Sequence, residues 1–483
     1  MFFYRFLQAS ARSFSIICQS FQLDKGLPFA EVLSERDIKK AFDDNECRFG
    51  EGEHDIFTPA VTLWGFLSQV LFTGAERSCK AAVHRISLLL ERLGRPVCSA
   101  NDGGFCKARA KIAEGVPKQL VRTMCERAER MAKSTLPNGR KNVWLVDGTT
   151  ATGPDTAKNQ AEYPQSDRQR KGCGFPMMRI VVLVSLMTAM VRSVAVGPYR
   201  GKGTGESALF RELAEDIPPG SVVVGDRYYC SYFAFVELWK KGIDVVARVI
   251  DARLEGLGKR DAFKRLKNGD LLVTWKKSVR PDWMSLEEHR ALPDSLTVRY
   301  IEVRVGKNGF RTQHLHIVTT LLAPETDPRE SLIELYHDRW HVELDLRAIK
   351  TTLGLDILRG QTPHMMRLEF FVGLLAYNLI RLYILNSAAT ADDPTVTPRN
   401  ISFTMAQNMI ATSLLLIHFM DAAASLTHTS DLLRRLATHR VGHRLNRVEP
   451  RVLKRQQKAY PHPKEPRSEL RKKLCKHHAL VVG

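Results

Sequence analysis

Apolar and polar positions divide the chain into a helical beginning, an alternating middle and a helical end. Up to residue 140, apolar side chains recur at spacings of three and four, as in Val83, Ile86, Leu90 and Leu93. This pattern predicts helices over 61–74, 75–94 and 116–133, with Gly74 and Gly94 as stops.

From residue 141 the pattern changes to short apolar runs. They predict strands separated by helices, and therefore an α/β fold with a mixed sheet and helices on its faces. The predicted strands are 142–146, 178–186, 188–196, 221–225 and 243–249, and the predicted helices are 205–217 and 229–241.

Residues 250–326 interrupt the alternation. Strand-like runs over 271–276, 296–305 and 312–320, with a turn signal at Lys307-Asn308-Gly309, predict a β-rich insertion. Apolar helices follow over 366–387, 401–421 and 424–438.

Between the insertion and these helices, residues 327–350 predict one helix with Asp327 as cap and Pro328 in its first turn. Helical spacing places one stripe of polar side chains on it: Tyr336, Arg339, Glu343, Arg347 and Lys350. Leu335, Val342 and Leu346 lie beside the stripe and can face a core. On spacing alone, a solvated face with ion pairs between neighbouring turns is the more usual explanation of such a stripe.

Charge narrows the class of partner. The formal net charge is +20 with a pI near 9.6, which favours a polyanion such as nucleic acid, with an acidic membrane surface as the other candidate. Residues 434–476 hold 15 Lys/Arg against 3 Glu. Four prolines in that stretch predict a flexible basic tail over 439–483, which either contacts DNA or is merely solvated.

A short cationic helix after the caps at 99–102 carries Lys107 and Arg109. In a helical bundle it suggests a helix-turn-helix-like DNA reader, and a plain helical scaffold is the alternative.

Cysteine usage and hydropathy bear on the compartment. The nine cysteines are scattered without a CxxC or Cys/His cluster, which predicts reduced thiols, a cytoplasmic protein and no structural zinc. The longest apolar run, 180–191, has strand length, so no membrane span is expected. The basic N-terminus is interpreted as an amphipathic segment of the folded protein rather than a transit peptide.

Three acidic residues stand at sequence positions where an α/β fold can bring them together. Asp147 and Asp226 each follow an apolar strand, and Glu343 lies on the helix after the sheet. Sites in open α/β sheets form beyond the carboxyl ends of strands, and carboxylate oxygens suit Mg²⁺ or Mn²⁺. A pair of such ions can activate a nucleophile for in-line phosphoryl transfer. Each aspartate could instead be a turn or cap residue.

These residues carry a family resemblance. The chain resembles the DDE transposases of bacterial insertion sequences, in the branch with a Tyr-x2-Arg-x3-Glu-x6-Lys signature, complete here as Tyr336, Arg339, Glu343 and Lys350. VWLVDGTT (143–150) and VVVGDRYY (222–229) look like the first and second Asp motifs of that family. FCKAR (105–109) and RVEPR (447–451) look like elements of one subgroup.

The resemblance implies a ribonuclease-H-like mixed-sheet core over 141–365, with the insertion at about 250–326. A helical DNA-end-binding domain would occupy 1–140, and a helical C-terminal region 366–438. Asp147, Asp226 and Glu343 would be the catalytic and metal-binding triad. Tyr336, Arg339 and Lys350 would grip the DNA end, with Arg227, Arg347 and Trp340 beside them.

The resemblance also implies donor cleavage and strand transfer, with a hairpin intermediate as one route. A base flipped out for that step would stack on a tryptophan: Trp275, Trp283 or Trp340. A homodimer is expected because two DNA ends must meet. A transposase relic that only binds DNA, and a nuclease of the same fold without joining activity, are the alternatives.

Overall fold

A computed structural model of the chain describes residues 12–23, 26–135, 142–201, 203–259, 261–305, 313–441 and 464–481. Some sequence expectations lie outside these residues: the first eleven residues of the expected amphipathic segment, the turn at 307–309 and the arginine-rich stretch 447–451.

The N-terminal part is helical, as its periodicity predicts. Thr58 caps α4 and Ser78 caps α5 by accepting backbone N–H groups, and Gly94 follows α5 with a positive φ of 65°. The helices are α2 (Ser15–Ser20), η1 (Ala30–Val32), α3 (Glu35–Asp44), α4 (Pro59–Leu71), η2 (Gly74–Arg77), α5 (Cys79–Arg92), α6 (Gly103–Arg109) and α7 (Gly115–Thr135).

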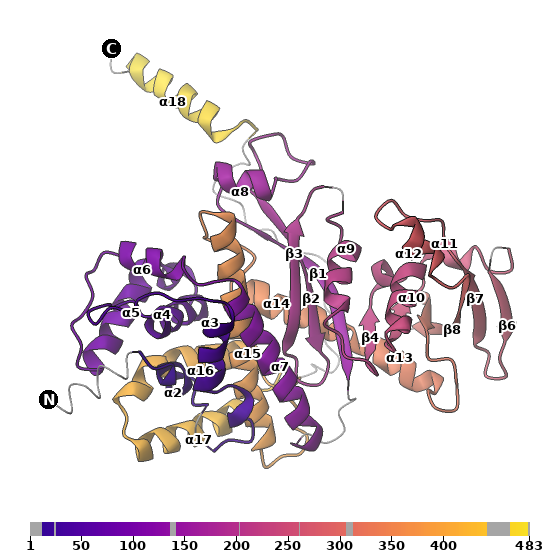
Figure 1. Ribbon diagram of the computed structural model, residues 1–483, viewed down its shortest axis with the longest axis horizontal. Helices are drawn as coiled ribbons and strands as arrows, with labels where there is room; N and C mark the ends of the chain where they lie inside the picture. The colour runs from indigo at the N-terminus through magenta and orange to yellow at the C-terminus, as the bar shows by residue number, and fades with distance from the viewer. Residues whose placement is uncertain are drawn as a thin grey trace.

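A nine-stranded mixed sheet forms the middle of the molecule, in the order β3-β2-β1-β4-β5-β9-β8-β7-β6 (Figure 1). In its first five strands β1, β4 and β5 run parallel, and β2 pairs antiparallel with β1 and β3. This order is consistent with the ribonuclease-H-like core that the resemblance implies. The strands are β1 (Val143–Thr152), β2 (Met177–Ser185), β3 (Val191–Pro198), β4 (Val222–Gly225), β5 (Asp244–Arg248), β6 (Ala262–Arg265), β7 (Leu271–Lys276), β8 (Ser295–Val305) and β9 (Gln313–Thr319).

Short helices connect these strands: α8 (Ala157–Glu162), α9 (Glu206–Ala214), η3 (Arg227–Tyr229) and α10 (Tyr232–Lys240). Among them α9 packs against β2 and β3, and α10 packs against β5. The predicted alternation of strands and helices is therefore present, with the helix after Asp226 beginning three residues later than expected.

The β-rich insertion is continuous with the sheet rather than separate from it, because β9 pairs antiparallel with β5. Its strand β6 and helices α11 (Asp251–Leu254) and α12 (Leu286–Arg290) were not predicted. The reason is local: all four residues of β6 are exposed and α12 buries none of its residues, so neither has an apolar pattern.

The expected helix over 327–350 is broken and starts later. Pro328 is the N-cap of α13 (Arg329–Asp338), a turn at Arg339 separates it from α14 (Trp340–Arg347), and a π-helical turn, η4 (Ala348–Thr352), ends it. Asp327 does not cap, because its carboxylate accepts from Thr326 and its carbonyl from Arg299. Leu335, Val342 and Leu346 are buried, as predicted.

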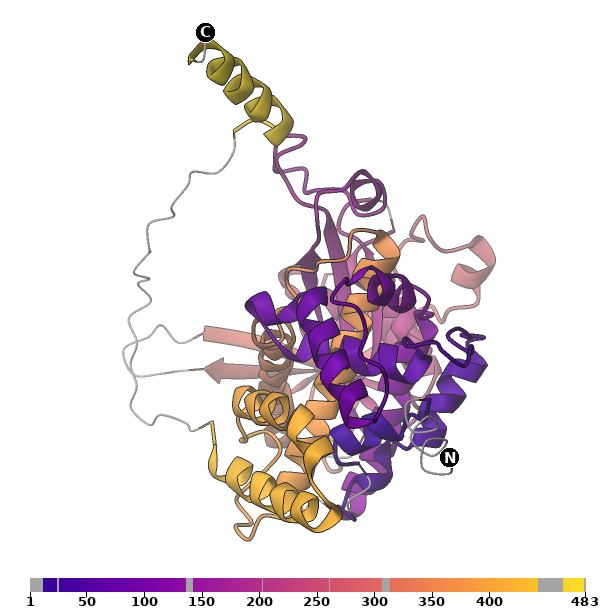
Figure 2. The same ribbon diagram turned by 90° about the vertical axis from the view of Figure 1, so that its left-hand side faces the viewer.

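Helix α15 (Pro363–Ala389) runs through the centre of the helical part and contacts α4, α7, α16 (Phe403–Leu416) and α17 (Ala422–Thr438). The N-terminal and C-terminal helices therefore share one packed region (Figures 1 and 2). By length and composition α15 could cross a membrane, but its apolar window is entirely buried in the protein. The 3₁₀ turn η5 (Ile417–Phe419) follows α16.

The tail forms a helix that its prolines gave no reason to expect. Helix α18 (Arg467–Val481) extends away from the sheet and the other helices (Figures 1 and 2). Residues 442–463, most of the predicted basic tail before α18, lie outside the described residues.

Candidate active site

Asp147 and Asp226 occupy equivalent positions on neighbouring parallel strands. The pairing of β1 with β4 ends at Leu145 and Val224, so each aspartate lies two residues beyond the last pair. Asp147 is not at the end of its strand, as the sequence suggested: β1 continues to Thr152 because residues 147–152 keep pairing with β2. The two aspartates nevertheless stand at the same level of adjacent strands where β4 ends, and the charge of Asp226 acts on Asp147.

Both aspartates also accept a local backbone hydrogen bond, but only Asp226 has the cap role that the simpler interpretation predicts, because Asp147 lies within a paired strand. Asp147 accepts from the N–H of Gly148 (2.8 Å), and Asp226 caps η3 by accepting from the N–H of Tyr228 (2.7 Å). These bonds fix the direction of each carboxylate and leave its other oxygen atom for further contacts.

Glu343 reaches the same region from α14, which packs against β1. Its Oε1 accepts from the guanidinium of Arg339 at 2.8 Å, and that guanidinium lies 5.9 Å from the centre of the Tyr336 ring. The signature residues Tyr336, Arg339 and Glu343 thus form one connected group at the break between α13 and α14.

Electrostatics shows that these groups act on one another. The pKa of Asp147 is raised to about 6: burial is the main cause, the charges of Asp226 and Glu343 add to it, and the hydrogen bond from Gly148 and the charge of Arg339 oppose it. Burial also raises the pKa of Tyr336, against the effect of Arg339. Three acids concentrated around one arginine form a site that a cation would stabilise.

The donor set fits a hard divalent cation. The three acids offer only carboxylate oxygen atoms, the ligands that Mg²⁺ and Mn²⁺ prefer. Nearby, the buried hydroxyl of Tyr229 has no hydrogen-bond partner among the described residues, and its pKa is raised by burial and by the charges of Glu206, Asp147 and Asp226. An unpaired polar atom at this position is expected beside a site that holds an ion and its water.

Glu206, in the first turn of α9, is a fourth acid that sequence reasoning missed. A Cβ atom on Gly148 would lie 2.4 Å from its carboxyl carbon, so only glycine leaves room for Glu206 there. Consecutive strand residues point to opposite faces, so Glu206 covers the face opposite the side chain of Asp147. Burial raises its pKa, Arg179 (3.6 Å) lowers it, and Asp226 raises it. The sequence did hold one signal for Glu206: it is an acidic residue at the start of the first helix after the β2–β3 hairpin.

The other residues that were predicted to hold the DNA differ from one another in solvent exposure. Lys350 is half-buried on the π-helical turn, which moves it off the straight α-helical stripe that the spacing predicts. Arg227, Trp340 and Arg347 are exposed. Trp340 is 53% exposed, three residues before Glu343.

The other two tryptophans differ from Trp340. Trp275 is fully buried in β7 and donates to the hydroxyl of Tyr300, so it is a core residue and no stacking platform. Trp283 is 46% exposed, but the guanidinium of Arg211 covers its ring at 3.7 Å from the centre.

Lys107 and Arg109 belong to α6, among the N-terminal helices and apart from α13 and α14 (Figure 1). Lys107 is exposed. Arg109 is used inside the protein: it donates to Gln69 (2.9 Å) and packs over the rings of Phe66 and Phe105. The predicted DNA-binding role of Arg109 stays a prediction, and the structure adds a packing role within the helical region.

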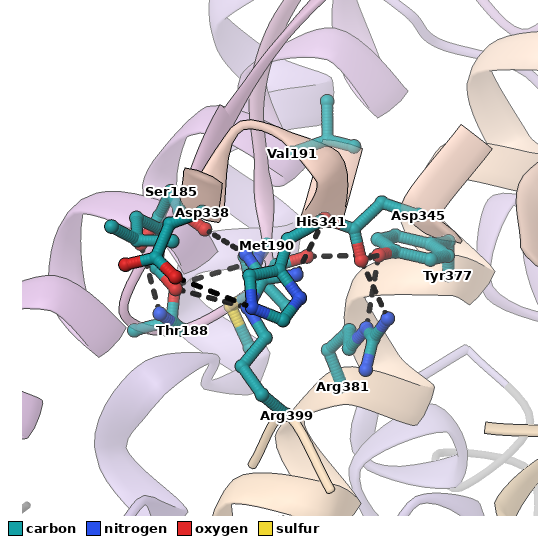
Figure 3. Close-up of polar contacts among 12 residues, drawn as sticks. Ser185, Thr188, Met190, Val191, Asp338, His341, Asp345, Tyr377, Arg381 and Arg399 are labelled. Atoms are coloured by element: carbon teal, nitrogen blue, oxygen red, sulfur yellow. Dashed lines mark hydrogen bonds and ion pairs between the residues drawn. The ribbon is translucent and has the colours of Figure 1, made fainter. Parts of the chain in front are cut away.

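The helix that bears Glu343 is anchored on its buried side by Asp345 (Figure 3). The carboxylate of Asp345 accepts from Arg381 (2.7 Å), Arg399 (2.7 Å) and the hydroxyl of Tyr377 (3.0 Å). The network joins α14 to α15 and to the loop before α16. Sequence reasoning did not identify it, because its members are dispersed over more than fifty residues.

Comparisons with known proteins agree with this geometry. Residues 138–379, half of the chain, match the family model described as the transposase DDE domain. The chain is 26% identical over 325 residues to the transposase InsG of insertion sequence element IS4 from Escherichia coli (strain K12), covering 65% of this chain and 68% of that protein.

Among solved structures, the chain is similar to a piggyBac transposase synaptic complex with hairpin DNA, determined by cryo-electron microscopy. The TM-score is 0.40 with 10% identity, over 86% of each chain, a likeness too distant to support further inference. The family match rests on the segment that carries all three acids and the signature helix. The chain therefore belongs to the transposase DDE domain family.

Proposed function

We propose that the chain is the transposase of an insertion sequence, which binds the terminal inverted repeats, cuts the donor DNA at their ends and joins those ends to target DNA. The observation that carries the proposal is that Asp147 and Asp226 stand in equal register on adjacent strands, with Glu343 on a helix that packs against β1 and close enough for its charge to act on Asp147. The charges of Asp226 and Glu343 both contribute to the raised pKa of Asp147, which supports one common site for the three acids.

Asp147, Asp226 and Glu343 would hold two divalent cations, Mg²⁺ or Mn²⁺, which when bound activate the attacking water or 3′-hydroxyl and stabilise the leaving oxygen. The side chains of this protein supply the rest. Arg339 presents a guanidinium beside the acids, where it can hold a non-bridging phosphate oxygen. Tyr336 packs against Arg339 and limits the positions that its guanidinium can take.

DNA would approach this site along the exposed cations near it, which include Arg227 and Arg347. Lys350 would add a positive charge from the π-helical turn. The helical N-terminal part, with Lys107 exposed on α6, and the basic tail would supply binding to the inverted repeats. Two protomers would pair the two ends.

The test separates binding from chemistry. Purified protein is mixed with DNA carrying the flanking inverted repeats and Mg²⁺, and the mobility shift, cleavage and strand transfer are measured separately. Asp147→Asn, Asp226→Asn and Glu343→Gln should each abolish cleavage and joining while retaining the shift. Asp155→Asn and Glu334→Gln, which change exposed acids close in sequence, are the matched controls and should remain active.

The alternatives give different results in the same experiment. A DNA-binding relic would shift the DNA with wild-type protein but never cut it. A nuclease without joining activity would cut the ends but give no strand-transfer product. Strand transfer by any one of the three triad variants would overturn the assignment of the triad.

A further inference from the structure

Two cysteines and an aspartate that are far apart in sequence meet among the N-terminal helices. Cys79 is the first residue of α5, Asp102 directly precedes α6, and Cys106 lies within α6. Their ligand atoms, two sulfurs and a carboxylate oxygen, all lie within 4.8 Å of one another, and all three residues are half-buried. Sequence spacing predicted no zinc, because the cysteines stand 27 positions apart.

We propose that Cys79, Asp102 and Cys106 bind a zinc ion. Two thiolates and one carboxylate are a ligand set that Zn²⁺ accepts in four-coordinate geometry, with the fourth position open to water or to a further group. Thiolates exclude Mg²⁺, which takes oxygen ligands, so this site differs in kind from the carboxylate triad. On binding, two Zn–S bonds form and the two thiol protons pass to the solvent.

The surroundings of the three ligands support the assignment. Asp102 stands at the N-cap position of α6, yet its side chain makes no capping hydrogen bond, which leaves the carboxylate for another partner. The amide of Gln69 donates to the sulfur of Cys79 at 3.5 Å. A side-chain N–H directed at a thiolate sulfur is the kind of contact that orients metal ligands in proteins.

The site would brace the contact of the N-terminal helices with the segment just after η4 and with α15. Gln69 also donates to the carbonyl of Arg77 at 2.9 Å, two residues before Cys79. The buried guanidinium of Arg77 donates to the carbonyls of Leu353 and Gly354, just beyond η4, and pairs with Glu369 at 2.9 Å. A bound zinc would fix α5 against α6 and thereby hold Arg77 in place.

The experiment uses the reduced, full-length protein and titrates it with Co²⁺, which occupies zinc sites and reports its ligands by absorption. The expected result is a thiolate-to-cobalt charge-transfer band with tetrahedral d–d bands at one Co²⁺ per chain, displaced by one equivalent of Zn²⁺. The charge-transfer band should be absent from Cys79→Ser/Cys106→Ser. Cys173→Ser, which removes another half-buried thiol, is the matched control and should keep the band.

Asp102→Asn keeps both thiols and should retain the charge-transfer band with Co²⁺ binding weakened at least tenfold. In excess Mg²⁺, which occupies the carboxylate triad, Zn²⁺ should raise the thermal midpoint of the wild type and leave that of the double variant unchanged. The absence of a charge-transfer band, or a band that persists in the double variant, would overturn the proposal. Cobalt on the carboxylate triad gives no thiolate band, so this result is independent of the proposed function.

Discussion

Arg399 donates to the buried carboxylate of Asp345 at 2.7 Å and, through its other amino group, to the backbone carbonyl of Ser185 at 2.7 Å. It therefore connects the helix of Glu343 to the end of β2, the strand that pairs alongside Asp147. Asp345 stands two residues after Glu343, so any shift of this contact moves a proposed metal ligand. The position of Glu343 thus depends on residues that lie on the buried side of its helix.

Arg399→Ala should lower the free energy of unfolding by about 1–3 kcal/mol, because Asp345 keeps Arg381 but loses its second arginine, and the backbone carbonyls that Arg399 contacts lose their donor. Urea unfolding followed by circular dichroism measures the change. Arg347→Ala, an exposed arginine on the same helix, is the control and should stay within about 0.5 kcal/mol of wild type. Equal stabilities of the two variants would show that the network does not anchor α14.

Asp147 should make the metal-free protein less stable as the pH rises. Its pKa is about 6 in the folded protein, against an ordinary value of 3.8. Between these two values the folded state holds a proton that the unfolded chain has lost, so the stability from this group falls as pH rises from about 4 to about 6, by up to about 3 kcal/mol. Above pH 6 the loss is complete.

The measurement compares urea unfolding of wild type and Asp147→Asn at pH 5 and pH 7 with a chelator present. Wild type should lose more stability than the variant between these pH values, because asparagine does not titrate. Adding Mg²⁺ at pH 7 should restore stability to wild type alone. Parallel pH profiles for the two proteins would contradict the shift.

Gly148→Ala should destabilise the fold by about 1–3 kcal/mol, because the new methyl group overlaps the carboxyl group of Glu206. Glu206→Ala in the same chain removes the obstructing atoms, so the double variant should recover most of the loss. Gly205→Ala, whose Cβ meets nothing within 4 Å, is the matched control. A double variant as unstable as Gly148→Ala would show that the strain lies in the backbone of β1.

Local patterns were sufficient for most of the sheet and for the long helices. The apolar runs before Asp147 and Asp226 placed β1 and β4, and helical spacing placed Tyr336, Arg339 and Glu343 together. The hydrophobic pattern did not predict features that depend on contacts with other parts of the chain. The extension of β1 past Asp147 depends on β2, and the break at Arg339 interrupts a continuous helical pattern.

The supporting residues of the site could not be derived from spacing. Asp345 looks like any helical acid until Arg381 and Arg399 are seen to surround it. Glu206 becomes notable only when Gly148 lies against it. In both cases the relevant partner is distant in sequence and the contact arises only from tertiary packing.

Trp340 offers the sharpest test of how the DNA end is held, given the proposed function. Trp340 directly follows Arg339 and precedes Glu343 by three residues, and its exposed ring can stack on an unpaired base, an interaction worth about 1–3 kcal/mol per base. Trp340→Ala should therefore keep its stability, reduce cleavage about tenfold or more and suppress base extrusion, while Trp340→Phe should retain most activity. A 2-aminopurine base placed next to the cut reports extrusion by fluorescence. Trp239→Ala, which removes a similarly exposed tryptophan on α10, is the control, and wild-type fluorescence from Trp340→Ala would exclude this residue as the platform.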